Sequence, residues 1–350
     1  MNSKRCGSQS VIFPTNPKIL STATIVGDVE GQGPIGKHFD LVLEDDTWGE
    51  DSWEKAERKM FEHSVRLACN KCNIAPESLD CMLGGDILNQ LISANFAARA
   101  IKAPFLGLYG ACSTMVEAML IGAMLIDGEY ASTVSATACS HFSTAERQYR
   151  SPLELGGQRP PTAQRTVTGA GTAILVSDEY QHNNESTHEL FNNIVISAGT
   201  IGKVIDLGVK DANNLGAAMA PAAADTIQVH LNDFNKTVDD FDLIVTGDLG
   251  SLGSELLNEL CKEKNIDLKD KHIDCGNTIF SKDQNVDCGG SGCGCCAVTF
   301  CGYLIKRLEA GDINNILFVA TGVLLSPDTT LQGDTIPSIA HAVVIERRVS

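Results

Sequence analysis

Apolar and polar positions alternate along the chain in blocks that predict an α/β protein. Short apolar runs rich in glycine, at residues 79–88 and 103–110, are typical of buried strands. Residues 52–72 carry apolar positions at helical spacing with charges between them, and residues 115–126 predict a helix that ends at Gly128. Strands that alternate with helices in this way indicate a largely parallel sheet.

Further strands are predicted near the start and near the end of the first 200 residues. Residues 11–13 and 18–27 predict strands, and the Gly/Pro-rich residues 27–36 predict a loop that can serve as a lid or a contact arm. Residues 166–179 predict another strand, and we expect residues 191–204 to pair with it.

The second half of the chain repeats the first in the same order. The strand that ends near Asp86 is matched by one that ends near Asp248, and the glycine-rich turn at Cys112 has a counterpart at Cys295. The distance from each of these cysteines to the glycine that ends the following helix is the same. Two fused copies of one βαβ-rich unit is the simplest account.

Cys112 is the candidate reactive group, because it lies between a predicted strand and a predicted helix. A helix N-terminus exposes backbone amides and favours a thiolate there, although a packed and inert cysteine fits the same local sequence. His141 follows the end of the next strand and is the first candidate for a partner of Cys112. The alternative for His141 is a purely structural role.

Other polar residues fall where a parallel sheet places its ligand pockets. Asp86 follows a strand and two glycines, and Asn89 and Asn95 lie in the segment after it, where they could line the same pocket or act as caps. Arg147 and Arg150 follow His141 closely, and arginine matches a carboxylate with two parallel hydrogen bonds.

The net charge of the chain limits the classes of molecule that it can bind. A net charge of −17 over 350 residues argues against a nucleic-acid partner and against direct adsorption to an anionic lipid surface. No apolar run reaches the ~18 residues that span a bilayer, and residues 1–10 lack the apolar core of a signal peptide. We therefore expect a cytoplasmic chain whose membrane association depends on partner proteins.

Thirteen cysteines raise the question of disulfides or metal. Most lie in apolar segments of a chain without an export signal, so we expect reduced and mostly buried thiols. The dense group at residues 288–301 lacks the paired knuckles of a structural zinc site, and its glycines predict a tight turn from a strand into a helix. We expect no resident metal or cofactor.

A duplicated α/β chain with a cysteine at the start of a helix is similar to the thiolase and ketoacyl-synthase fold. That resemblance implies two βαβ-rich halves, residues 1–190 with Cys112 and residues 191–350, whose central sheets and buried helices stack as αβαβα layers. Within the superfamily the chain resembles the stage V sporulation protein AD family, on stretches in one order that include GPIGKHFD, GGDILNQLISANFAAR, YGACST, SHFSTAERQYR, GKVIDLGV, TGDLG and GGSGC.

The family resemblance implies a non-enzymatic role. Its members bind dipicolinic acid and take part in its uptake into developing endospores, with partner subunits in the membrane. It also implies a homodimer, and a chain held at the forespore or spore inner membrane through those partners.

The polar residues predicted near Cys112 bear independently on the expected non-enzymatic role. A condensing enzyme needs two further polar groups beside its cysteine, as a rule histidine with histidine or asparagine. Asp248 stands where the repeat predicts a histidine, and Ser291 stands near the second position. The alternative is a condensing or acyl-transfer enzyme in which Cys112 is the nucleophile and His141 or His341 the base.

A pocket for dipicolinate needs cationic or amide donors, because burying an unpaired charge costs several kcal/mol. Asp86 and Asp248 would repel the dianion unless they are protonated or a calcium ion enters with it and takes their oxygens. The candidate donors are Cys112 through its neighbouring amides, Asn89, Asn95, His141, Arg147, Arg150 and Lys203.

Overall fold

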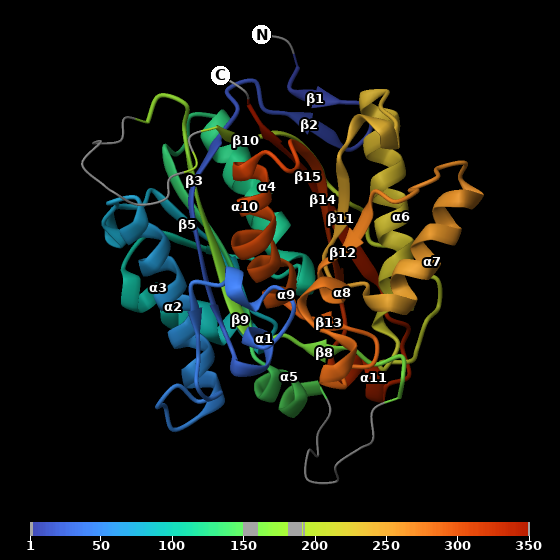
Figure 1. Ribbon diagram of the computed structural model, residues 1–350, viewed down its shortest axis with the longest axis horizontal. Helices are drawn as coiled ribbons and strands as arrows, with labels where there is room; N and C mark the ends of the chain where they lie inside the picture. The colour runs from blue at the N-terminus through green and yellow to red at the C-terminus, as the bar shows by residue number, and fades with distance from the viewer. Residues whose placement is uncertain (1–2, 150–159, 181–190, 192, 349–350) are drawn as a thin grey trace.

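The computed structural model describes residues 3–149, 160–180, 191 and 193–348. Its ribbon is a stack of five layers (Figure 1): two outer pairs of helices enclose two sheet layers, and a further set of helices lies between the sheets. The αβαβα arrangement expected from the resemblance is therefore confirmed.

The strands of the two halves follow the same spatial order. In the first half the order is β3, β9, β7, β5, β6, and in the second half it is β10, β15, β14, β11, β12, so that the first strand of each copy lies beside the last. The first-half strands are β3 (Lys18–Val26), β5 (Cys81–Gly85), β6 (Phe105–Gly107), β7 (Thr133–Ser140) and β9 (Gly169–Val176). The second-half strands are β10 (Ile194–Thr200), β11 (Leu243–Thr246), β12 (His272–Asp274), β14 (Asn315–Val323) and β15 (Ser338–Arg347).

The expected pairing of residues 166–179 with residues 191–204 is wrong. Strand β9 lies between β3 and β7, whereas β10 pairs along its length with β15 and pairs with β3 at Val195 and Lys18. The physical reason is the duplication itself, because β10 opens the second copy as β3 opens the first. The boundary between the halves stays a prediction.

The remaining elements are short strands and helices that connect these layers. The short strands are β1 (Arg5–Cys6), β2 (Ser10–Ile12), β4 (Leu41–Val42), β8 (Arg165–Thr166) and β13 (Gly290–Ser291). The helices are α1 (Asp28–Gly31), α2 (Trp53–Lys71), α3 (Ile92–Ile101), α4 (Thr114–Asp127), α5 (Phe142–Tyr149), α6 (Leu215–Phe234), α7 (Gly250–Glu263), α8 (Cys275–Ile279), α9 (Cys293–Val298), α10 (Ile305–Ala310) and α11 (Pro327–Leu331). A π-helix, Thr299–Leu304, joins α9 to α10.

Helix α4 lies in the middle layer because its sequence is apolar on nearly every side. It packs against β7 of the first half and against β14 and β15 of the second. On the outside, α2 begins at Ser52, whose side chain accepts the N–H of Lys55, and it buries one face that includes Met60 and Val65 against the first sheet. The two helices thus occupy the layers that their apolar patterns predict.

The cysteine-rich helix α9 is a packing element. A side chain at Gly171 of β9 would collide with Ala297, and one at Gly294 would collide with the backbone of Gly169, so small residues bring helix and strand together. Cysteine is small and apolar enough for such contacts. All thirteen cysteines carry free thiols and twelve of them are buried, which confirms the expectation of reduced, mostly buried thiols.

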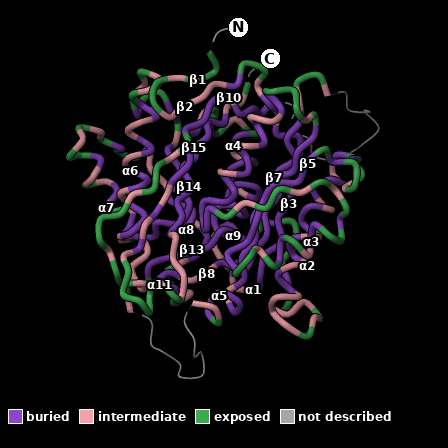
Figure 2. The backbone as a smooth tube through the Cα atoms, turned by 180° about the vertical axis from the view of Figure 1, so that it is seen from behind, coloured by how far each residue is buried: buried purple, intermediate pink, exposed green. Residues whose placement is uncertain are grey.

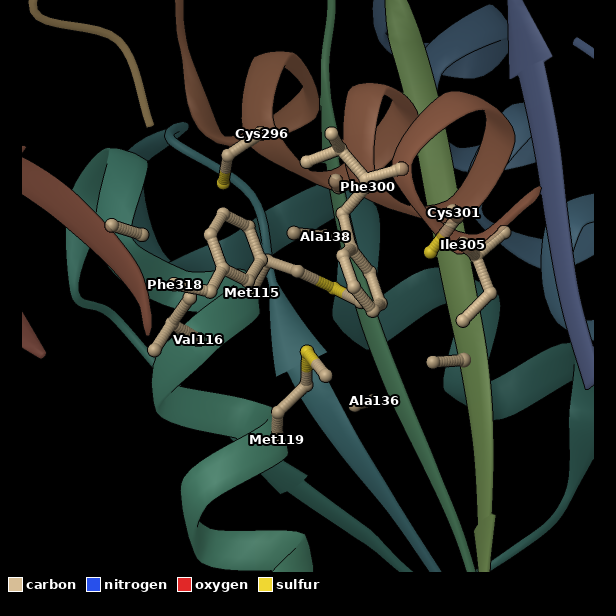
Figure 3. Close-up of a cluster of buried hydrophobic side chains, with 14 of the residues drawn as sticks. Met115, Val116, Met119, Ala136, Ala138, Cys296, Phe300, Cys301, Ile305 and Phe318 are labelled. Atoms are coloured by element: carbon tan, nitrogen blue, oxygen red, sulfur yellow. The ribbon is translucent and has the colours of Figure 1, made fainter. Parts of the chain in front are cut away.

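The described residues form three apolar cores that match the layers. Two of them each lie between an outer helix pair and its sheet, and the third joins the two halves around α4 and α9. Figure 2 shows this burial as a continuous interior along the strands and middle helices. Figure 3 shows the centre of the third core, where Met115 and Met119 of α4 meet Phe300 of the π-helix and Phe318 of β14. Among the described residues, no helix is both long and apolar enough to cross a membrane.

Glu30 of α1 makes the stability of the fold depend on pH. Its side chain is buried and accepts the N–H of Thr168, and burial raises the pKa of Glu30 to about 7. The folded chain therefore keeps a proton that the unfolded chain releases near its ordinary pKa of about 4.3, so this group favours folding more strongly as the pH falls from 8 to 5. We expect Glu30→Gln to be more stable than the native chain by about 1–3 kcal/mol at pH 8, and by much less at pH 5.

Urea unfolding at pH 5, 6.5 and 8 measures this difference. Glu255→Gln, at an exposed position of α7, is the control and should show no such pH-dependent gap. A gap for Glu30→Gln that is the same at all three pH values would contradict the buried-carboxyl account.

Candidate functional site

Cys112 lies on a short 3₁₀ turn, Ala111–Ser113, between β6 and α4. Ala111 has a φ of 51°, a left-handed conformation that costs energy for a residue with a side chain. Gly322 of β14 packs directly on the turn, since a side chain there would collide with the carbonyl oxygen of Gly110. Both halves of the fold therefore hold Cys112 in place, and its position at the start of a helix was predicted correctly.

Cys112 faces a cavity of about 310 Å³ at the junction of the two halves. Tyrosines, aliphatic side chains and small polar groups make up most of the wall. The lining residues are Ile87, Tyr109, Ala111, Cys112, Ala145, Glu146, Tyr149, Gln164, Thr166, Ala212, Asn213, Leu215, Ser291, Gly292, Val323 and Leu325. No lysine, arginine or histidine is among the residues found in this wall over the described part of the chain.

A chain of three polar groups runs from the cavity into the second half. The Cys112 Sγ atom lies 3.9 Å from the Ser291 Oγ atom, and the Ser291 hydroxyl donates to Asp248 Oδ2 at 2.7 Å. Asp248 also accepts from the Thr321 hydroxyl, at 2.9 Å, and from the N–H of Gly292. Because the Ser291 hydroxyl donates to Asp248, its oxygen is left to accept a hydrogen bond from the Cys112 thiol.

This arrangement keeps the Cys112 sulfur protonated. Burial, followed by the nearby Asp248 carboxylate, raises the pKa of the Cys112 thiol well above its ordinary value. Burial also raises the pKa of Asp248, against the hydrogen bonds that it accepts. A thiol is a weak nucleophile compared with a thiolate, and no histidine of the described residues lines the cavity beside Cys112.

His141 does not lie in the cavity wall. Its Nδ1 atom accepts the N–H of Ser143, and its Nε2 atom donates to the carbonyl oxygen of Asp46 at 2.6 Å. The ring is fully buried, and burial lowers the pKa of His141 below its ordinary value. Both ring nitrogens are thus engaged in holding the turn after β7, which is the structural alternative for this residue.

Two further candidates from the second half also lie outside the cavity wall. The Nδ1 atom of His341 accepts the N–H of Gly202, and burial lowers the pKa of His341 to about 4. Lys203, the next residue along, is exposed at the surface. Neither of them is in the cavity wall.

Asp86 occupies the position that corresponds to Asp248, but its environment differs. Its carboxylate accepts the N–H groups of Leu88 and Ala94 and thereby fixes the loop between β5 and α3. Burial raises the pKa of Asp86 to about 6, and Glu57 lies close enough to interact with it electrostatically. The two aspartates therefore do not share the cavity, so the structure does not support a calcium site built from both of them.

Asn89, Asn95 and Arg147 lie on the outer surface near that loop. Asn89 and Arg147 line a separate, open hollow of about 380 Å³, where Arg147 pairs with Glu54. The Asn95 amide donates to the carbonyl oxygens of Gln90 and Leu91. Arg150 lies outside the described residues.

The cavity contains polar residues that sequence reasoning did not select. Tyr109 and Tyr149 place their hydroxyl oxygens 3.2 Å apart, and the Tyr149 hydroxyl donates to the carbonyl oxygen of Ile87. Thr166 and Asn213 reach the cavity from the strand β8 and from the segment before α6. No spacing in the sequence marks these positions, because they come together only through the packing of the two halves.

Comparison with known proteins places this chain in a family. The sequence model of stage V sporulation protein AD matches residues 7–346. The chain belongs to this family. It is 43% identical to the stage V sporulation protein AD of Bacillus subtilis (strain 168) over 344 residues, which cover 98% of each chain.

Solved structures similar to this member of the stage V sporulation protein AD family share its thiolase-like fold. A human mitochondrial 3-ketoacyl-CoA thiolase matches with a TM-score of 0.57 at 11% identity, over 96% of this chain and all of that one. The 3-oxoacyl-[acyl-carrier-protein] synthase III of Aquifex aeolicus VF5 matches with a TM-score of 0.56 at 15% identity, over 94% of this chain and 99% of that one. A cerulenin-bound OleA from Xanthomonas campestris matches with a TM-score of 0.59 at 13% identity, over 95% of this chain and 97% of that one. At these identities the likeness concerns the fold alone.

Proposed function

We propose that the cavity beside Cys112 binds dipicolinic acid without chemical conversion. On this proposal the chain takes part in dipicolinate uptake into developing endospores, as a subunit of a membrane-bound complex. The observation that carries the proposal is the polar chain of Cys112, Ser291 and Asp248, which holds the thiol protonated in a sporulation-family protein. A protonated thiol suits a wall that shapes a pocket better than it suits a nucleophile.

The size and composition of the cavity support a small planar ligand. A volume of about 310 Å³ lies at the lower end of small-molecule pockets. The aromatic ring of the ligand would lie against Tyr109 and Tyr149, and its carboxylates would take hydrogen bonds from the side chains of Thr166 and Asn213. Binding would thus depend on neutral donors.

The charge of the cavity wall bears on whether dipicolinate binds as the free dianion or as its calcium chelate. Glu146 is an acid in the cavity wall, and the described wall contributes no basic side chain to offset a dianion. Burying two carboxylates without a cation is costly, so the wall favours the neutral calcium chelate over free dipicolinate. On this proposal the calcium ion enters with the ligand and takes no oxygen atoms from Asp86 and Asp248.

Asn213→Ala is expected to weaken dipicolinate binding by about ten-fold or more, because a hydrogen bond to a charged group is worth about 1.5–3 kcal/mol. Isothermal titration of dipicolinic acid, with and without calcium, measures the affinity, and an isomeric pyridine dicarboxylate tests selectivity. Lys203→Ala is the control, since Lys203 is exposed outside the cavity, and its affinity should match that of the native chain.

The same titration with Cys112→Ala separates binding from catalysis. We expect this variant to retain binding, because the thiol serves as part of the wall. If the native chain binds no dipicolinate in either form and instead accepts an acyl group from a thioester on Cys112, the protein is an acyl-transfer enzyme and the proposal is wrong.

A further inference from the structure

A cluster of basic side chains lies away from the cavity, around Tyr303 of the π-helix. The His38 ring is 5.1 Å from the Tyr303 ring, and the Arg307 guanidinium lies 5.7 Å from the same ring. Lys306 Nζ donates to the carbonyl oxygen of His38 at 3.0 Å. Lys37, beside His38 and exposed, is the fourth basic residue of this group.

The backbone is shaped to bring these residues together. They come from the 3₁₀ turn Gly36–His38 and from the junction of the π-helix with α10. A side chain at Gly36 would collide with the carbonyl oxygen of Gly31, and one at Gly302 would press on Phe39. Gly302 therefore lets the π-helix pack closely on His38 and Phe39, and Gly36 lets the turn pack closely on the end of α1. A π-helical turn inside a helix is itself a frequent mark of a functional site.

The basic groups of the cluster form no close ion pairs in the described part of the chain. Within the described residues, Lys37, Lys306 and Arg307 form no ion pair with a carboxylate, and the adjacent Asp40 is committed to Lys71 at 2.7 Å. Gathering like charges is unfavourable, and it is unexpected in a chain whose net charge is −17. Burial and the two neighbouring lysines lower the pKa of His38, which is the expected response to this repulsion.

We propose that Lys37, His38, Lys306 and Arg307 form a binding site for a phosphate group. A guanidinium matches two phosphate oxygens at once, lysine ammonium groups act as point charges, and the Tyr303 hydroxyl can donate a further hydrogen bond. Bringing a phosphate to this position would relieve the repulsion among the basic groups. The site is separate from the cavity and does not depend on the ligand proposed there.

The phosphate could belong to a lipid headgroup or to a free anion. Leu41 and Val42 of β4, four and five residues after Lys37, are 38% and 40% exposed, and exposed aliphatic side chains beside basic ones are a common feature of lipid contacts. The strongly negative chain as a whole would be repelled by an anionic membrane, so any lipid contact would be local to this cluster. The test below distinguishes the two sources.

Two probes test the site on the full chain. One is inorganic phosphate, titrated calorimetrically in a phosphate-free buffer, and the other is flotation with vesicles of phosphatidylglycerol diluted in phosphatidylcholine. The variant Lys37→Gln with Arg307→Gln removes two charges of the cluster. The matched control is Lys262→Gln with Lys269→Gln, which removes two exposed lysine charges from the α7 region.

We expect the cluster variant to lose at least ten-fold in affinity for one of the probes, while the control changes less than two-fold. Binding of free phosphate identifies a small-anion site, and binding of the vesicles alone identifies a lipid headgroup. An equal loss of affinity in both double variants would show that the effect depends on overall charge, and it would overturn the proposal. The proposal would also be wrong if the native chain, shown to be folded by its unfolding temperature, bound neither probe.

Discussion

Phe300→Ala is expected to lower the free energy of unfolding by about 3–5 kcal/mol, the usual cost of removing a buried phenylalanine ring. Phe300 is fully buried in the π-helix, and its ring stacks on Phe318 of β14 with a centroid distance of 5.1 Å. It belongs to the core that joins the two halves, where it lies among side chains of α4, including Met115 (Figure 3). Removing the Phe300 ring would therefore weaken the packing between the two halves of the fold as well as the packing within one half.

Thermal unfolding measures this effect, and from the usual entropy of unfolding per residue we expect a fall of about 5 °C in the midpoint. Phe300→Leu, which keeps most of the apolar volume, should cost clearly less. Phe96→Ala, at a partly exposed position of α3, is the matched control. Equal losses for Phe300→Ala and Phe96→Ala would show that the central core contributes no more than the surface.

Asp248→Asn is expected to make Cys112 react with iodoacetamide about ten-fold faster or more at pH 8. The Asp248 carboxylate is one of the causes that raise the pKa of the Cys112 thiol, so removing its charge increases the thiolate fraction, by ten-fold for each unit of pKa. An asparagine oxygen can still accept the Ser291 hydroxyl, which keeps the local geometry.

Mass spectrometry of the intact protein, with peptide mapping, follows this reaction. Cys6 is the only cysteine that is not buried, so a Cys6→Ser background removes the main competing thiol. Asp274→Asn is the matched control, because Asp274 is also a buried acid but its bonds hold the start of α7 through Leu249 and Gly250. If Cys112 already alkylates rapidly in the native chain, or if both variants change the rate equally, Asp248 does not control the thiol.

The outcome for Asp248 also bears on the choice between binding and catalysis. Cys112 could alkylate slowly in the native chain and rapidly in Asp248→Asn. That result would mean that the Asp248 carboxylate, from the second half of the fold, lowers the reactivity of a cysteine at the start of a helix. The solved structures at 11–15% identity share the fold with this chain, and a fold by itself does not determine function.

Several features of this protein were determined by its sequence alone. The alternation of apolar runs and helical patterns predicted the α/β layers, and the matched turns at Cys112 and Cys295 predicted the duplication. The position of Cys112 between a strand and a helix and the burial of the cysteines were also predicted correctly. These features depend on periodicity and on turn residues, which act over a few neighbours in the chain.

The repeat placed Ser291 and Asp248 near Cys112, and the structure brings these three residues together. The rest of the site was decided only by the tertiary structure, since His141, which is near Cys112 in sequence, turns its ring toward Asp46. Asn213 reaches the cavity without any mark in the sequence. Strand order and helix packing set which side chains converge, and the direction of a side chain depends on contacts between segments far apart in the chain. Local patterns therefore locate the ends of strands, and the packing of the two halves selects the residues that share a cavity there.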